Sequence, residues 1–178
     1  MLIQLTGLPG AGKSTLALAV QAELKKKGIA VEIIDGDVYR QTLCRDLGFS
    51  KEDRCENMRR LGRVAHAFVQ QGRIAIIAAI NPYEEIRQEI RENYEAKTVW
   101  LDCPLDVLIQ RDPKGLYRRA LLPKDHPQKI NNFTGIDDPF ELPEHADLTI
   151  NTAAFDLQEA TRKLSGFIIT SLQFVVAS

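Results

Sequence analysis

The sequence predicts a three-layer α/β fold, in which helices flank a mostly parallel five-stranded sheet. Short apolar runs rich in valine and isoleucine alternate with longer segments of helical periodicity, which is the pattern of parallel strands joined by crossover helices. The runs are also apolar along their whole length, as strands buried on both faces are. The predicted strands span residues 2–6, 29–34, 74–79, 98–102 and 148–150.

Composition limits the class of protein before any motif is considered. A chain of 178 residues is long enough for one domain with its own core, so we expect a single domain over 1–178. The formal net charge of -1 argues against a surface built for nucleic acid or membrane, and we expect neither as a partner. The three cysteines lack a Cys-x-x-Cys spacing, which fits a reducing, cytoplasmic compartment. The N-terminus lacks a basic leader, so no signal peptide is expected.

The helical segments have recognisable ends. A helix over 13–27 is expected to end at Gly28, since glycine commonly follows a helix C-terminus. Ser50 is expected to cap a long helix that ends at Gly72. The region 111–146 includes a stretch without periodicity, from 122 to 146, that contains several prolines. Because such a long irregular stretch is more often functional than a linker, we expect a lid there and call 111–146 the lid segment.

A phosphate-binding loop follows the first predicted strand. Residues 7–14 match the pattern G-x-x-x-x-G-K-[ST], in which backbone N–H groups surround phosphate oxygens, the lysine reaches the outer phosphates and the serine ligates Mg²⁺. The strand before it and the helix after it favour a nucleotide loop over a structural glycine turn. The residues expected to bind ATP here are Gly7, Leu8, Pro9, Gly10, Ala11, Gly12, Lys13, Ser14 and Thr15.

The rest of the chain favours a kinase over other proteins with this loop. A switch GTPase needs an Asn-Lys-x-Asp segment and an Asp-x-x-Gly after a strand, and the sequence has neither. A nucleotide-driven motor usually needs a longer chain. A small P-loop kinase with a lid and a second substrate pocket fits best.

Two carboxylates follow the second predicted strand. Because ligands of open α/β sheets bind at the carboxyl ends of strands, Asp35 and Asp37 should lie beside the phosphate loop. A carboxylate there can orient and deprotonate an attacking hydroxyl group. The alternative is that both are turn residues and that one caps the next helix.

Together with the phosphate loop, several further segments resemble the adenylyl-sulfate kinase family. They occur in the family's order and extend the similarity over nearly the whole chain. These segments are Asp35-Gly36-Asp37-Val38-Tyr39-Arg40, Asp46 to Ser50, Asp53 to Arg60, Arg111 to Tyr117 and Asn132 to Pro139.

The resemblance implies a reaction and assigns roles. The γ-phosphoryl group of ATP would be transferred to the ribose 3′-hydroxyl of adenylyl sulfate, with Mg²⁺ required and a homodimer as the assembly. The implied catalytic residues are Asp37, Lys13 and Lys114, with Asp37 as the base or as the anchor of a Mg²⁺-bound water. Ser14 would bind Mg²⁺, and Arg111 would lie beside the ATP adenine. The implied acceptor-binding residues are Asp35, Asp37, Arg40, Phe49, Arg54, Asn57, Ile80, Asn81, Lys114 and Phe133.

Residue chemistry supports several of these roles, with alternatives. Arg54 and Asn57 are three apart on a predicted helix and share a face. Phe49 and Phe133 could enclose a purine by stacking, although Phe49 could instead staple the helix start and Phe133 could pack in the core. Lys114 and Arg118 are expected on one helical face that closes over ATP, with a solvated face as the alternative.

The chain departs from the family's pattern at Asn81. Many members carry a serine there, in some of them phosphorylatable, whereas this chain has Ile80-Asn81-Pro82-Tyr83. Asn81 excludes a phosphoserine intermediate and favours direct transfer. Residues 121–129 also form a longer loop than expected. The alternatives are therefore a kinase for another nucleotide-linked acceptor and a nucleotide-binding regulatory protein without activity.

Overall fold

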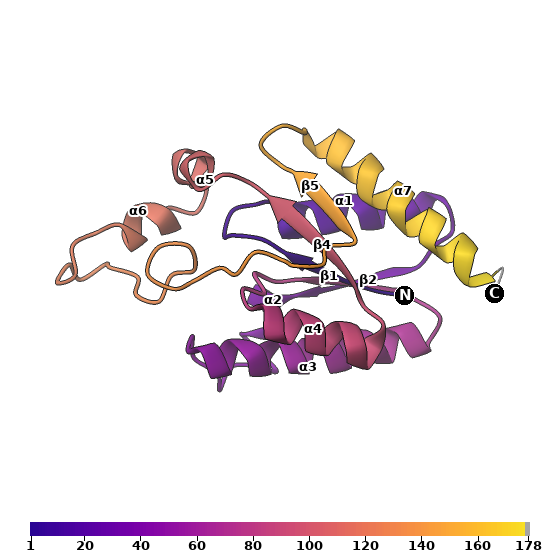
Figure 1. Cartoon of the computed structure of the whole chain (residues 1–178), viewed down its shortest axis with the longest axis horizontal. Helices are drawn as coiled ribbons and strands as arrows, with labels where there is room; N and C mark the ends of the chain where they lie inside the picture. The colour runs from indigo at the N-terminus through magenta and orange to yellow at the C-terminus, as the bar shows by residue number, and fades with distance from the viewer. Residues whose placement is uncertain (177–178) are drawn as a thin grey trace.

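The computed structural model describes residues 1–176 as a three-layer α/β fold (Figure 1). Its sheet is parallel throughout, with strand order β2-β3-β1-β4-β5. The predicted architecture is therefore confirmed, while residues 177–178 of the expected domain lie outside the described part. The strands are β1 (Leu2–Thr6), β2 (Val31–Asp35), β3 (Ile74–Ala78), β4 (Lys97–Asp102) and β5 (Leu148–Asn151).

Helices cover both faces of the sheet. Alternate strand residues point to opposite sides, and since apolar residues occur on both sides of the strands, both faces need to be buried. Ile3 and Leu5 of β1 pack with the helices α1 (Lys13–Lys26) and α7 (Leu157–Val176). Leu2 faces the other layer, formed by α3 (Lys51–Gln70) and α4 (Glu84–Tyr94). Figure 1 shows the two helix pairs on opposite sides of the strands.

Element ends lie within two residues of the predicted ones. Ser50 Oγ accepts a hydrogen bond from the backbone N–H of Asp53, so it caps α3 as expected. Strand β2 begins at Val31, two residues later than predicted. The backbone N–H of Ile29 instead donates to Leu24 O and closes the last turn of α1, with Gly28 in the left-handed region.

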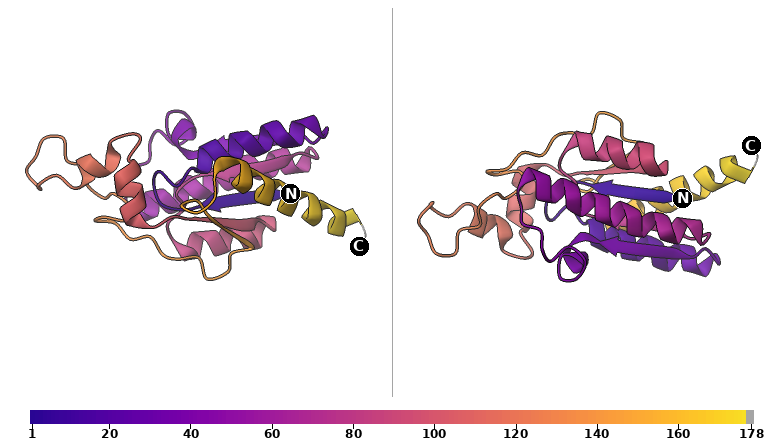
Figure 2. Two further views of the ribbon diagram at one scale, coloured as in Figure 1. Left: turned by 90° about the horizontal axis from the view of Figure 1, so that it is seen from above. Right: turned by 90° about the horizontal axis from the view of Figure 1, so that it is seen from below.

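The last residues of the lid segment return beside α4, where Arg91 Nη2 donates a hydrogen bond to His145 O. The rest of the lid segment lies at the carboxyl ends of the strands. Seen from above and below, it projects away from the end of the molecule where the two chain termini lie (Figure 2). It includes the helix α6 (Leu116–Ala120) and follows α5 (Leu105–Arg111). None of the described helices is long and apolar enough to cross a membrane.

The prediction that Lys114 and Arg118 share one helical face is wrong. Lys114 lies in a turn between α5 and α6. Gly115, with a φ angle of +64°, is the N-cap of α6. The carboxylate of Asp112 accepts hydrogen bonds from the backbone N–H groups of Tyr117 and Arg118. The turn separates Lys114 from the helix and leaves its side chain free to point toward the sheet.

Candidate active site

The phosphate loop connects β1 to α1 and is folded by its glycines. Gly7, Gly10 and Gly12 all have positive φ angles. A Cβ atom at Gly7 would lie 2.7 Å from Leu101 O, so no larger residue fits there. The loop thus presents its backbone at the N-terminus of a 14-residue helix, where N–H groups and the helix dipole favour an anion.

Lys13 is buried beneath this loop. Its Nζ donates hydrogen bonds to Gly7 O at 2.7 Å and Leu8 O at 2.9 Å. Burial lowers the pKa of Lys13 to about 8, although the nearby carboxylates of Asp37 and Asp35 oppose the shift. An anion in the loop would stabilise the charged amine and raise this pKa.

Asp35 combines the capping role with a position beside the phosphate loop. One carboxylate oxygen accepts hydrogen bonds from the backbone N–H groups of Asp37 and Val38, which caps α2 (Gly36–Tyr39). The other oxygen accepts a 2.5 Å hydrogen bond from Ser14 Oγ. The capping alternative is therefore observed, but it does not withdraw the carboxylate from the loop.

These oxygens suit a magnesium ion. Ser14 Oγ and the Asp35 carboxylate are hard donors in direct contact, and Asp37 lines the same cavity. No group of three or more His, Cys, Asp or Glu side chains that could hold a metal occurs in the part of the chain that the structure describes. The donor set thus fits an ion that takes the rest of its ligands from water and substrate phosphates, as Mg²⁺ does.

Asp37 is exposed and faces the lid segment. Its side chain is 79% exposed, and Lys114 Nζ lies 3.3 Å from its Oδ2. Both side chains line the cavity that also contains Lys13, Ser14 and Asp35. The turn that separates α5 from α6 therefore brings Lys114 to the carboxylate of Asp37, which lies just after β2.

A second pocket adjoins this cavity and is rich in cationic and amide groups. Asp37, Ala79 and Ile80 line both. The remaining polar side chains of the second pocket are those of Arg40, Arg54, Asn57 and Asn81.

The two guanidinium groups of the second pocket, those of Arg40 and Arg54, have different hydrogen-bond partners. Arg54 is buried and donates to Phe49 O and Asn132 O, with Asp138 3.5 Å away. Arg40 donates to Gly48 O at 2.8 Å and has no carboxylate within salt-bridge distance among residues 1–176. Burial and then the neighbouring Arg54 lower the pKa of Arg40. An anion would relieve that repulsion.

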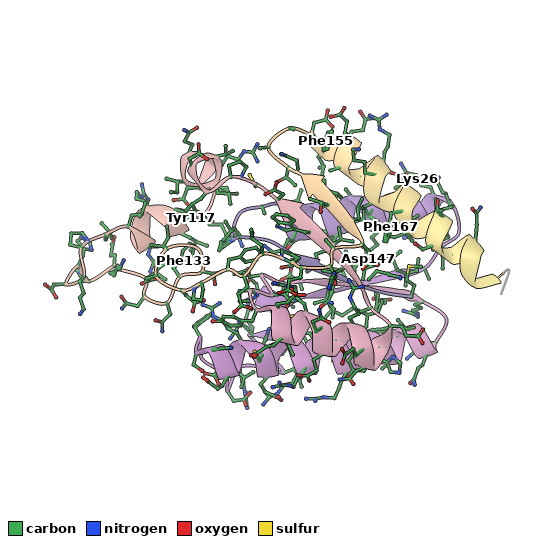
Figure 3. All side chains as sticks on the ribbon, in the orientation of Figure 1. Lys26, Tyr117, Phe133, Asp147, Phe155 and Phe167 are labelled. Atoms are coloured by element: carbon green, nitrogen blue, oxygen red, sulfur yellow. The ribbon has the colours of Figure 1, made fainter. Side chains whose placement is uncertain are left out.

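Phe49 and Phe133 have different environments. Phe49 is 55% exposed, and the Arg40 guanidinium lies 4.5 Å from its ring centre. Phe133 is 8% exposed and meets Tyr117 edge-on, with ring centres 5.0 Å apart (Figure 3). Tyr117 in turn donates a hydrogen bond to Pro9 O of the phosphate loop. Phe133 is thus packed as the core-packing alternative describes, and its contact with an acceptor adenine stays a prediction.

A third hollow lies on the other side of the phosphate loop. Arg111 lines it with Gly12 and Thr15, and its Nη1 donates to Thr152 O at 3.0 Å. Phe155 also lines this hollow. Thr152 and Phe155 follow β5, and only the general rule that ligands bind at the carboxyl ends of strands could have indicated them.

Comparisons with known proteins agree on one family. The family described as adenylylsulphate kinase matches residues 1–151. A probable adenylyl-sulfate kinase of Bacillus subtilis is 47% identical over 94% of this chain and 84% of its own length. The adenylyl-sulfate kinase of Microcystis aeruginosa is 44% identical over 91% of this chain and 87% of its own.

A solved structure agrees with the sequence comparisons. The APS kinase of Mycobacterium tuberculosis, solved in complex with AMPPNP and APS, has a TM-score of 0.86 and 35% identity, covering 94% of this chain and 96% of that one. A shikimate kinase of Aquifex aeolicus, at 18% identity and a TM-score of 0.52, shares the fold alone. The chain belongs to the adenylylsulphate kinase family.

Proposed function

We propose that this protein is an adenylyl-sulfate kinase, which transfers the γ-phosphoryl group of ATP to the ribose 3′-hydroxyl of adenylyl sulfate. The main support for this proposal is the position of Asp37. Its exposed carboxylate lines both the cavity at the phosphate loop and the pocket that contains Arg40 and Arg54. A phosphoryl donor in one and an anionic nucleotide in the other would meet at Asp37. The names of relatives over nearly the whole chain support the same reaction.

In this mechanism the chain's own groups position and stabilise charge. Asp37 orients the 3′-hydroxyl and accepts its proton as the oxygen attacks the phosphorus atom. Lys13 leaves its carbonyl partners to bind the outer phosphates, and Lys114 exchanges Asp37 for the transferred group as the lid segment closes. Ser14 and Asp35 would hold Mg²⁺, which neutralises phosphate charge when bound. Asn81 has no hydroxyl group to phosphorylate, which favours direct transfer between the bound substrates.

The two nucleotides are proposed to bind in separate pockets. ATP would occupy residues 7–15, with its adenine in the hollow beside Arg111. The phosphosulfate and ribose of the acceptor would contact Arg40, Arg54 and Asn57, since paired guanidinium groups bind such anions well. Phe49 offers an exposed ring for the acceptor adenine. Phe133 lines neither pocket and would have to leave its packing against Tyr117 to stack on the other face of that adenine.

An ADP-formation assay with Mg²⁺ and ATP tests this function. Adenylyl sulfate should stimulate ADP release, while AMP and adenosine at equal concentration should not, because they lack the phosphosulfate. Stimulation by another nucleotide but not by adenylyl sulfate would favour the alternative kinase. No stimulation by any nucleotide would favour the regulatory protein.

We also propose a cytoplasmic homodimer. The cytoplasmic location is supported by the three free cysteines. The dimer rests on the family resemblance, and one related APS kinase, from Thiobacillus denitrificans, is described as hexameric. Sedimentation equilibrium should give twice the chain mass of 20.0 kDa; any other multiple rejects the dimer.

A further inference from the structure

A buried polar network on the α4 face of the sheet joins β1 and β4 to the turn that follows β3. Gln4 lies in the central strand β1, and its side chain is fully buried. Its Nε2 donates to Arg87 O at 2.8 Å and to Thr98 Oγ1 at 3.0 Å. Its Oε1 accepts a 2.9 Å hydrogen bond from Asn81 Nδ2. A buried amide is costly unless its hydrogen bonds are made, and here both ends of it are paired.

The network fixes the orientation of both amides. The carbonyl of Arg87 can only accept a hydrogen bond, so Gln4 must turn its NH₂ group toward it. The oxygen of Gln4 then faces Asn81, which must present its own NH₂ group. Asn81 Oδ1 is buried without a partner in the part of the chain that the structure describes. The hydrogen bond to Gln4 is therefore the one hydrogen bond that the Asn81 side chain makes among the described residues.

The backbone at Asn81 is in an unusual conformation that the network supports. Its φ angle is +49°, in the left-handed region that asparagine tolerates better than most residues. Its carbonyl accepts hydrogen bonds from Thr6 Oγ1 at 2.9 Å and from Arg87 Nη1 at 2.8 Å. The preceding carbonyl, Ile80 O, accepts from Thr6 Oγ1 and from the backbone N–H of Gly7.

This turn connects the two halves of the active site. Gly7 is the first residue of the phosphate loop, and it is hydrogen-bonded to Ile80, which lines both pockets. Asn81 lines the acceptor pocket. A change in the turn would therefore move the acceptor pocket relative to the phosphate loop. A misplacement of about 1 Å between reacting groups can lower a rate about a hundredfold.

We propose that Gln4 and Asn81 are positioning residues: Gln4 holds Asn81 in its left-handed turn, and the turn sets the acceptor nucleotide in line with the phosphate loop. This inference rests on the proposed function and adds Gln4, which lies outside both pockets, to the residues on which the reaction depends.

The test compares Asn81→Gly with Asn81→Ala. Both variants lose the amide, but only glycine adopts a positive φ without strain. If the left-handed turn positions the acceptor, kcat/KM for adenylyl sulfate should be about five- to thirtyfold lower in Asn81→Ala than in Asn81→Gly. That factor corresponds to the free-energy cost of holding a residue other than glycine in the left-handed region. The Kd for ATP should differ between them by less than about twofold, because the phosphate loop is unchanged.

Glu95 provides a matched control. It also has a left-handed φ of +51°, but it is exposed at the end of α4 and lines neither pocket. Glu95→Gly and Glu95→Ala should differ in thermal stability and not in kcat/KM. Gln4→Met, which keeps the volume and loses the hydrogen bonds, should lower kcat/KM for adenylyl sulfate more than it weakens ATP binding. If it does not fold, Asn81→Gly against the wild type tests the same contact, because glycine keeps the turn and loses the hydrogen bond to Gln4. A wild-type kcat/KM in Asn81→Gly would overturn the role of Gln4.

Each outcome is decisive. Equal kcat/KM values for Asn81→Gly and Asn81→Ala would overturn the inference, because the turn would then have no role of its own. The inference also fails if the variants change only the melting temperature while the folded fraction keeps wild-type kinetics. Failure of the wild-type protein to phosphorylate adenylyl sulfate would instead refute the proposed function, and the inference with it.

Discussion

The buried amine of Lys13 makes ATP binding dependent on pH in a way that can be calculated. With a pKa of about 8 in the free protein, Lys13 is charged in about nine of ten molecules at pH 7, in half at pH 8 and in about one of ten at pH 9. Bound phosphates favour the charged amine and raise its pKa. Binding should therefore take up about half a proton per site at pH 8 and about 0.9 at pH 9.

The sign follows from linkage. Because the complex holds more protons than the free protein, affinity must fall as the pH rises through the pKa of the free Lys13. The fraction of free protein with a charged Lys13 falls about tenfold from pH 7 to pH 9. The Kd for ATP should therefore rise by about the same factor of ten.

Isothermal titration calorimetry measures both quantities. Titrations in two buffers of different ionisation enthalpy give the proton uptake, and each titration gives Kd. The control is Lys13→Arg, which keeps a positive charge but does not titrate in this range. An equal proton uptake in the two proteins, or a Kd for ATP that is flat between pH 7 and pH 9, would refute the assignment of a depressed pKa to Lys13.

Three further changes test separate parts of the site. Asp37→Asn should lower kcat by about a hundredfold or more while the Kd for ATP stays nearly constant, and an unchanged kcat would remove Asp37 as the base. Phe133→Ala should lower the free energy of unfolding by about 3 kcal/mol, because that ring is buried against Tyr117. Phe49→Ala should change the free energy of unfolding by less than about 0.5 kcal/mol, because the ring is exposed, but should weaken adenylyl sulfate binding by about 1 to 3 kcal/mol. Urea titrations and binding measurements on both variants check this; a large loss of stability in Phe49→Ala and a loss of binding only in Phe133→Ala would contradict it. Lys114→Ala should lower kcat with little effect on stability, since its pair with Asp37 is solvent-exposed; a large loss in urea-measured stability with normal kcat would make the pair structural.

Local chemistry in the sequence was sufficient for most of the architecture. Buried parallel strands leave continuous apolar runs, and the phosphate loop needs glycines at fixed positions, so both were predictable. The start of β2 was not, because Ile29 is apolar but uses its N–H to close α1. The turn at Lys114 was obscured by helical spacing, although Pro113 and Gly115 flank it.

The positions of the candidate site residues were predictable where a local pattern places them and unpredictable where their partners are distant in sequence. Asp35 and Asp37 follow a strand, and that alone places them. Gln4 resembles any residue of a short strand, and its significance depends on partners 77 and 83 residues away. Phe133 lies in a polar stretch, and only the folded chain brings it against Tyr117.

The product of the reaction shows directly whether the protein phosphorylates adenylyl sulfate. The protein is incubated with adenylyl sulfate, Mg²⁺ and ATP labelled in the γ-phosphate, and the nucleotide products are separated and examined by phosphorus NMR. We predict that the label appears as a monoester on the ribose 3′-oxygen of adenylyl sulfate, with one ADP formed per labelled product. ADP formation without a labelled acceptor, or label at any other position, would contradict the account.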